Sequence, residues 1–197
     1  MGNRVLDREP GSGLPLNDQL RFDAGSAALN LLATVGQRRS RHPVDRLTSA
    51  GRLGDWLAGA GLPAVPVTAD DLAAARDLRE AGYRILASPA LLARADVETL
   101  SAWSSRPVPG PSLLLVAGQI KAEEPPATIT TVLADLAREL VRLATAGDER
   151  LRACDGPECG MLYLDTSRGR RRRWCSMARC GNIAKVGRFR ESAGAER

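Results

Sequence analysis

The sequence predicts an α+β protein that is mostly helical, with a helical N-terminal domain carrying one small β-hairpin and a C-terminal treble-clef-like zinc finger. Leu, Ala and Val recur at helical spacing through most of residues 19–149. All four cysteines lie within 27 residues, in two C-x4-C pairs. We therefore expect a flexible lead over residues 1–18, a helical domain over 19–149 and a cysteine-rich module over 150–197.

Charge is distributed unevenly along the 197 residues, which carry a net charge of +5. Residues 150–197 contain 12 basic and 5 acidic side chains, whereas residues 1–149 contain 16 and 18. A basic module on a slightly acidic body indicates a polyanionic partner, although a solubilising tail is the alternative. No apolar run approaches the roughly 18 residues that span a bilayer, and the N-terminus lacks a signal-peptide core. A cytoplasmic protein without membrane contact is expected.

Four helices are predicted in the first hundred residues. The first covers Ser26–Gln37, and the second covers Ala50–Ala60 and ends at Gly61. A capping box formed by Thr68 and Asp71 begins the third. For the fourth, "SPALLARADVETLSAW" predicts Ser88 as N-cap and Pro89 as the first helical residue.

A segment of different amino-acid composition follows these helices. "PVPGPSLLLVAGQIKAEEPP" is bounded by prolines and holds the apolar run Leu113–Val116, which predicts a β-hairpin. A long amphipathic helix begins near Ile129 and ends near Gly147.

The cysteine pairs supply four thiolates, which suit one tetrahedral structural Zn²⁺ per chain. The predicted ligands are Cys154, Cys159, Cys175 and Cys180. Two disulfides, a redox dithiol and an iron–sulfur cluster are the alternatives. A catalytic zinc is disfavoured because four thiolates leave no open position.

Around the cysteines we expect a hairpin and a helix. Met161–Asp165 is predicted to form one strand, and "RRRW", residues 171–174, is predicted to form the second strand of the hairpin that pairs with it. A helix is predicted over Met177–Glu191, with Ile183 and Val186 packed inward. A 48-residue module has a small core, so metal binding would supply much of its folding free energy.

Basic side chains cluster on the same module. Arginine suits bidentate phosphate contact, and a helix is available for a groove, so double-stranded DNA is the expected partner. An RNA- or protein-binding adaptor with a purely structural zinc is the alternative. The predicted nucleic-acid-binding residues are Arg168, Arg170, Arg171, Arg172, Arg173, Arg179, Lys185, Arg188 and Arg190.

The segment "CDGPECGMLYLDTSRGRRRRWCSMARCGN" resembles the bacterial CGNR zinc-finger family, and the preceding residues from about 20 are similar to the ABATE-type domain. The resemblance implies a stress-induced transcriptional regulator, with the four cysteines as zinc ligands and the finger binding DNA. It also implies that the N-terminal domain senses an unknown small molecule or a stress. Because a single small finger buries limited surface, a homodimer is a further expectation. Ile183 follows "CGN" where the family has Arg, and Asn30 and Ala33 replace its Asp and Asn, so these contacts differ here.

The N-terminal part offers few further candidates. His42 beside Pro43 is expected to be a loop residue, and the basic stretch from Arg38 to Arg41 an exposed face rather than an anion site. The large aromatic side chains are expected in the core rather than lining a pocket; they are Trp56, Tyr83 and Trp103. No nucleophile–base pair or phosphate loop is evident, so we do not expect an enzyme.

Overall fold

The structure, a computed structural model, describes residues 18–186. Most of the predicted lead, and the predicted contacts Arg188 and Arg190, lie outside the described residues. The helical elements are α1 (Ala27–Leu32), α2 (Ala50–Gly59), α3 (Ala69–Ala87), α4 (Arg94–Ser104), α5 (Ile129–Thr145) and the π-helical turn η1 (Met177–Gly181). The strands are β1 (Val35–Gly36), β2 (Val44–Asp45), β3 (Ser112–Val116), β4 (Gln119–Glu123), β5 (Leu151–Ala153) and β6 (Leu162–Leu164).

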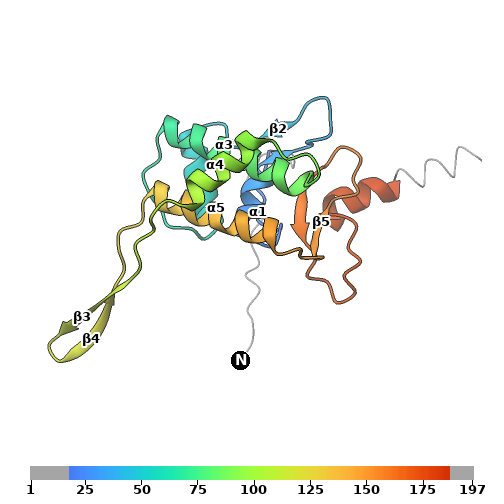
Figure 1. The fold of residues 1–197 in the computed structure, drawn as a ribbon. Helices are drawn as coiled ribbons and strands as arrows, with labels where there is room; N and C mark the ends of the chain where they lie inside the picture. The colour runs from blue at the N-terminus through green and yellow to red at the C-terminus, as the bar shows by residue number, and fades with distance from the viewer. Residues whose placement is uncertain (1–17, 187–197) are drawn as a thin grey trace, which may run out of the picture.

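Helices form the body of the molecule, as the sequence predicts. Helix α5 packs against α3, α4 and α1, and α1 also contacts α3 and β6 (Figure 1). The core is built mainly from Leu and Ala, together with the fully buried Trp56. The strands form three separate antiparallel pairs, β1–β2, β3–β4 and β5–β6. The predicted α+β, mostly α fold is confirmed.

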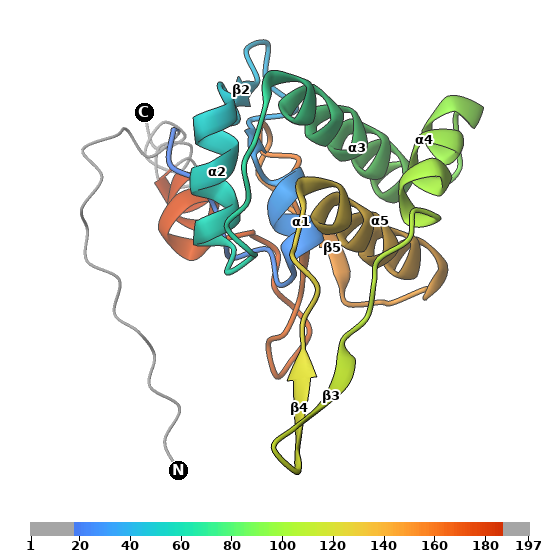
Figure 2. The same ribbon diagram turned by 90° about the vertical axis from the view of Figure 1, so that its left-hand side faces the viewer.

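Several predicted elements are confirmed at their predicted positions. Helix α2 begins after the N-cap Ser49. The capping box of α3 is present, because Asp71 N donates to Thr68 Oγ1 at 3.2 Å and Thr68 N donates to Asp71 Oδ2 at 2.8 Å. The β3–β4 hairpin turns at Ala117 and Gly118, both with positive φ, and projects from the helical body (Figures 1 and 2).

The first helix is shorter than predicted. It ends at Leu32 rather than Gln37, and its last carbonyl accepts a hydrogen bond from outside the helix, from Arg38 Nη2 at 3.2 Å. Thr34 Oγ1 donates to Leu31 O at 2.6 Å, and Arg46 Nη1 donates to Ala33 O at 3.0 Å. The next residues then pair with β2 as strand β1.

The predicted start of the fourth helix at Ser88 and Pro89 is wrong. Ser88 is the C-cap of α3, and α4 begins at Arg94 without a side-chain cap. Tertiary contact fixes this start, because the buried Asp96 in the first turn of α4 accepts two hydrogen bonds from Arg84 of α3, at 2.6 and 2.8 Å. Pairing with α3 therefore outweighs the local capping signal.

Candidate metal centre and nucleic-acid interface

The four cysteines converge on one point. Their Sγ atoms all lie within 4.8 Å of one another, and the distances from Cys175 Sγ to the Sγ atoms of Cys159 and Cys180 are both 3.6 Å. Tetrahedral zinc with Zn–S bonds of about 2.3 Å separates its sulfurs by about 3.8 Å. All four thiols are free in this structure, and the Sγ–Sγ distances from Cys175 are longer than the roughly 2.05 Å of a disulfide bond. The donor set fits one structural Zn²⁺ and leaves no open ligand position.

Local backbone turns position each pair of thiols. Cys154 follows β5, and its N–H donates to Met161 O at 2.8 Å, which closes the first turn. Gly156 fits tightly inside this turn, because a Cβ there would lie 3.0 Å from Cys159 Cβ and 3.2 Å from Cys180 Sγ. Cys180 lies in η1, where the π-helical turn carries its sulfur back toward Cys175.

Hydrogen bonds to sulfur support the thiolate form of the ligands. Cys154 Sγ accepts from the backbone N–H groups of Cys175, at 3.2 Å, and Gly156, at 3.4 Å. Arg21 Nη1 donates to Cys175 Sγ at 3.2 Å. Burial alone would lower the pKa of Arg21, but the hydrogen bond to Asp23 and the Cys175 thiolate outweigh burial and raise it. Sequence reasoning missed Arg21, which lies 154 residues from Cys175 and in no motif.

The predicted return partner of the Met161–Asp165 strand is wrong. Strand β6 pairs with β5, in the register Leu151↔Leu164 and Ala153↔Leu162, and not with residues 171–174. Side chains of the β6 segment hold the arginine segment instead. Tyr163 Oη donates to Arg172 O at 2.5 Å, and Asp165 Oδ2 accepts from Arg172 N at 2.8 Å. Burial raises the pKa of Tyr163 to about 12, which keeps its hydroxyl protonated as this donor.

The predicted inward packing in the finger helix is also wrong. Helical residues continue from η1 through residues 182–186, but the side chains of Ile183 and Val186 are exposed. The buried position of this segment is Gly181, where a Cβ would meet Met177 Sδ at 2.7 Å and Trp174 Cδ1 at 3.3 Å. Trp174 therefore packs beside the metal centre, and the helix turns Ile183 away from it.

The arginines between the cysteine pairs have different environments. Arg168, Arg170 and Arg171 are exposed. Arg172 points inward and donates to the carbonyls of Trp174 and Cys175. Arg173 Nε donates to Asp155 Oδ2 at 2.7 Å.

Strand β5 contributes a further arginine to this surface. The exposed Arg152 lines a shallow groove of about 530 Å³ together with the segment Arg170–Arg173. Sequence reasoning missed Arg152, because only the β5–β6 pairing brings it beside the arginine segment. The groove is lined by these five arginines and by one acidic residue, Asp155, which pairs with Arg173, so its net charge is positive.

Two family matches cover most of the chain. Residues 25–147 match the ABATE family, described as "Putative stress-induced transcription regulator". The chain belongs to this family. Residues 150–193 match the CGNR zinc finger, as the cysteine geometry indicates. No curated protein matches the chain. Within the described residues, no helix is long and apolar enough to cross a membrane.

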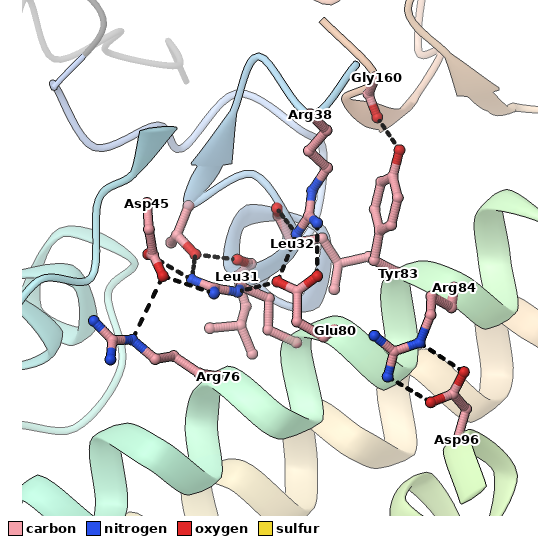
Figure 3. A network of polar contacts seen from close by, with 12 residues as sticks. Leu31, Leu32, Arg38, Asp45, Arg76, Glu80, Tyr83, Arg84, Asp96 and Gly160 are labelled. Atoms are coloured by element: carbon pink, nitrogen blue, oxygen red, sulfur yellow. Dashed lines mark hydrogen bonds and ion pairs between the residues drawn. The ribbon is translucent and has the colours of Figure 1, made fainter. Parts of the chain in front are cut away.

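The ABATE region and the finger are in direct contact. The backbone N–H groups of Arg38 and Arg39 donate to Cys159 O and Glu158 O, each at 3.1 Å. Tyr83 Oη donates to Gly160 O at 2.8 Å (Figure 3). Residues of β6 and two of the zinc ligands also belong to the same hydrophobic cluster as the ABATE helices.

At the N-terminal side of this contact, Gly25 has φ +98, and a Cβ there would lie 2.9 Å from Leu164 Cβ. The neighbouring Leu164 N donates to Ala24 O at 2.8 Å. A glycine is therefore needed where the chain passes close to β6.

The remaining candidate residues of the ABATE region contribute to packing or lie on the surface. Arg38 was expected on an exposed face, but it is largely buried and pairs with Glu80 at 2.8 Å (Figure 3). Its guanidinium also lies 3.9 Å from the centroid of the Tyr83 ring. His42 is exposed, and Trp56 is fully buried as predicted. Asn30, at a position where the sequence departs from the family pattern, accepts from Ala24 N at 3.0 Å.

Proposed function

We propose that this chain is a transcription regulator, and not an enzyme, whose zinc finger binds double-stranded DNA through phosphate contacts. The observation that carries the proposal is the groove where Arg152 from β5 joins the arginine segment. A guanidinium offers a planar pair of donors to a phosphate, and its rigid fork loses less side-chain entropy per hydrogen bond than a lysine does. Family membership supports a regulatory role.

The arginines divide into two roles in this proposal. Arg168, Arg170 and Arg171 contact phosphate, because they are exposed on the loop. Arg172 and Arg173 hold the loop through their hydrogen bonds to the finger. Arg179 and Lys185 add charge along the finger helix, and the predicted contacts Arg188 and Arg190 lie outside the described residues.

We further propose that the β3–β4 hairpin joins two copies of the chain into a homodimer. Its cross-strand partners Leu115 and Ile120 are 76% and 73% exposed, and Leu113 is equally open. An isolated two-stranded hairpin is marginally stable in water, so this apolar pair requires cover. A second copy supplies an identical apolar strand pair, and a two-fold pairing of hairpins buries both at once. Dimerisation also doubles the DNA surface available to one small finger.

The test is DNA binding by the full-length, zinc-loaded protein, measured by fluorescence anisotropy over a range of salt concentrations. In the variant Arg170→Ala/Arg171→Ala, the slope of log affinity against log salt should become shallower by about 1.8, since each phosphate contact contributes about 0.9. The matched control is Arg94→Ala/Arg142→Ala, which removes two exposed arginines from helices of the ABATE region. This control should retain the parental slope.

Competition separates the proposal from its alternatives. Duplex DNA should displace the labelled duplex more effectively than heparin or single-stranded RNA does at matched salt. If heparin competes as well as the duplex, the regulator proposal fails. If RNA competes better than the duplex, the finger is an RNA-binding module.

A further inference from the structure

The four metal ligands differ in their access to solvent. Cys154 and Cys175 are buried, whereas Cys159 and Cys180 are partly exposed. A cavity of about 480 Å³ lies beside the metal centre, where the finger meets the ABATE region. Of the four ligands, Cys159 and Cys180 line this cavity, and the two buried ones do not. One ligand from each C-x4-C pair therefore faces a space that a small molecule can enter.

Hydrogen bonding divides the four ligands in the same way. Cys154 Sγ accepts from two backbone N–H groups, and Cys175 Sγ accepts from Arg21 Nη1. In the part of the chain that the structure describes, no N–H group donates to the Sγ of Cys159 or Cys180. A hydrogen bond to a thiolate stabilises its charge and lowers its nucleophilicity. The two accessible sulfurs are therefore also the more nucleophilic ones.

Gly156 brings these two ligands together. A Cβ at this position would lie 3.0 Å from Cys159 Cβ and 3.4 Å from Cys180 Cβ, so both side chains border the space that the glycine leaves. The Sγ atoms of all four cysteines lie within 4.8 Å of one another. A disulfide bond of about 2.05 Å between Cys159 and Cys180 therefore requires their sulfurs to approach by less than about 3 Å.

The charges around the cavity suit a neutral reactant. Arg46 and Arg179 contribute positive charge to the wall, whereas Glu158 and the two thiolates contribute negative charge. An ion of either sign therefore meets a like charge in this cavity. Hydrogen peroxide is small and neutral, and it oxidises cysteines according to their exposure and thiolate character.

We propose that Cys159 and Cys180 form an oxidation site for hydrogen peroxide, at which their thiolates are converted into a disulfide bond. One thiolate attacks peroxide, so that an S–O bond forms, the O–O bond breaks and hydroxide leaves. The second thiolate attacks the sulfur of the resulting sulfenic acid, which forms the S–S bond and releases a second hydroxide. Two electrons thus pass from the two sulfurs to peroxide, and the product is the same whichever sulfur reacts first.

This disulfide bond removes half of the metal ligands. Cys154 and Cys175 are left as two of the four ligands that a structural zinc site requires. Oxidation at the cavity should therefore release the metal from the finger.

Peptide mapping of the full-length, zinc-loaded protein tests the site directly. The protein is treated with hydrogen peroxide until half of the zinc is released, and free thiols are then alkylated. Trypsin separates Cys175 from Cys180 by cleavage after the arginine between them. A glutamate-specific protease separates Cys154 from Cys159 by cleavage after the glutamate between them. Each cysteine is thereby assigned to its own fragment.

Mass spectrometry should find Cys159 joined to Cys180, with Cys154 and Cys175 alkylated. A first disulfide bond that includes Cys154 or Cys175 overturns the proposal. Four alkylated thiols after treatment with peroxide overturn it as well.

Zinc release, followed with a chromophoric indicator, gives a second readout. The metal should be released in step with disulfide formation, and dithiothreitol with added zinc should restore the bound metal. Reversal by a thiol excludes oxidation of Met161 or Met177 as the cause, because methionine sulfoxide requires a dedicated reductase. Zinc release that dithiothreitol does not reverse overturns the proposal.

Two variants identify the reacting sulfur. Cys180→His keeps four possible zinc ligands but removes one of the two sulfurs, so peroxide should release its zinc about fivefold more slowly or less. The matched control is Met177→Leu, which replaces an exposed residue of the same π-helical turn and should keep the parental rate. Equal rates in Cys180→His and the parent overturn the assignment. The peptide map of the parent does not depend on either variant.

A regulatory consequence rests on the proposed DNA binding. Arg172 holds the arginine segment through the carbonyls of Trp174 and Cys175, so loss of the metal at Cys175 should loosen this segment. Oxidation should raise the apparent Kd for duplex DNA by about tenfold or more, and dithiothreitol with zinc should restore it. Unchanged DNA affinity after oxidation overturns this regulation. Formation of the Cys159–Cys180 disulfide bond in a protein that does not bind DNA overturns the proposed function and leaves the oxidation site intact.

Discussion

Arg171 and Arg172 are neighbours in a run of four arginines, yet their surroundings differ. Arg171 is exposed. In contrast, Arg172 Nε donates to Trp174 O at 2.8 Å, and the Arg172 guanidinium lies 4.5 Å from the centroid of the Tyr163 ring. The same segment is fixed from the other side by Tyr163 and Asp165. The loop therefore depends on one arginine for its conformation and offers the other to a partner.

This difference predicts that substitution of Arg172 lowers stability, whereas substitution of Arg171 mainly lowers DNA affinity. Arg172→Ala should lower the free energy of unfolding by about 1–3 kcal/mol, because it leaves two carbonyls without their charged donor. Arg171→Ala should change it by less than about 0.5 kcal/mol, as is usual at the surface, and should weaken DNA binding. Urea unfolding and fluorescence anisotropy measure the two effects. Equal loss of stability in both variants would contradict these roles.

At the scale of elements, helix α3 is joined to its neighbours by partly buried ion pairs (Figure 3). Glu80 accepts from Arg38 at 2.8 Å and from Arg79 Nε at 2.7 Å, and Arg79 also donates to Asp45 at 2.7 Å. Burial alone would raise the pKa of Glu80, but the hydrogen bond and charge of Arg38 outweigh burial and hold this pKa below its ordinary value of 4.5. The ionised carboxylate thus stabilises the contact between α3 and the segment that reaches the finger.

The lowered pKa gives this contribution a definite pH dependence. It is fully present above about pH 4.5 and is lost as pH falls through the lower pKa of the folded state. Glu80→Gln should therefore be less stable than the parent by about 1–2 kcal/mol at pH 7. The difference should vanish as the parent carboxylate becomes protonated, which urea unfolding between pH 7 and pH 3 will measure. A difference that stays constant with pH would show that Glu80 does not act through its charge.

The hairpin is the second element with a prediction of its own. Leu115→Lys/Ile120→Lys should convert the proposed dimer into a monomer, because it places charges on the apolar cross-strand pair. Light scattering after size exclusion should give twice the chain mass of 21.0 kDa for the parent and 21.0 kDa for the variant. Ser112→Lys/Gln119→Lys, at polar positions of the same strands, is the matched control. A parent that is monomeric at high micromolar concentration would rule out this interface.

At the scale of the whole molecule, the zinc centre and the ABATE helices share one hydrophobic cluster. Cys154, Cys175 and Tyr163 are buried in it together with side chains of α1 and α5. Thiolates released from zinc repel one another or must be protonated, so the metal stabilises the folded arrangement. Loss of the metal should therefore also lower the stability of the ABATE helices.

Chelation tests this coupling. Removal of zinc should lower the midpoint of thermal unfolding followed by circular dichroism at 222 nm, a signal dominated by the ABATE helices. Cys175→Ser should reproduce the effect without a chelator, and Arg94→Ala/Arg142→Ala should keep the parental midpoint. A helical transition that is unchanged by zinc removal would show that residues 150–197 unfold as an independent module, as the sequence predicts.

The metal ligands, the class of fold and most helices were predictable from the residues alone, because these features depend on local spacing. Two C-x4-C pairs can bring four sulfurs together through short turns, and the capping box of Thr68 and Asp71 is complete within four residues. Only the tertiary structure decided what depends on distant partners. The start of α4 follows from Arg84 and Asp96, and β6 pairs with β5 while Asp165 holds the arginine segment through a hydrogen bond from Arg172 N.

The same reason explains the candidate sites. Four consecutive arginines are identical letters in the sequence, and only the contacts of Arg172 with Tyr163 and of Arg173 with Asp155 separate the structural arginines from the exposed ones. Arg21 and Arg152 belong to no motif, and their roles follow only when the fold brings them to the zinc centre and to the groove. Local chemistry therefore identified the metal site, whereas the long-range contacts between finger and helices created the surfaces around it.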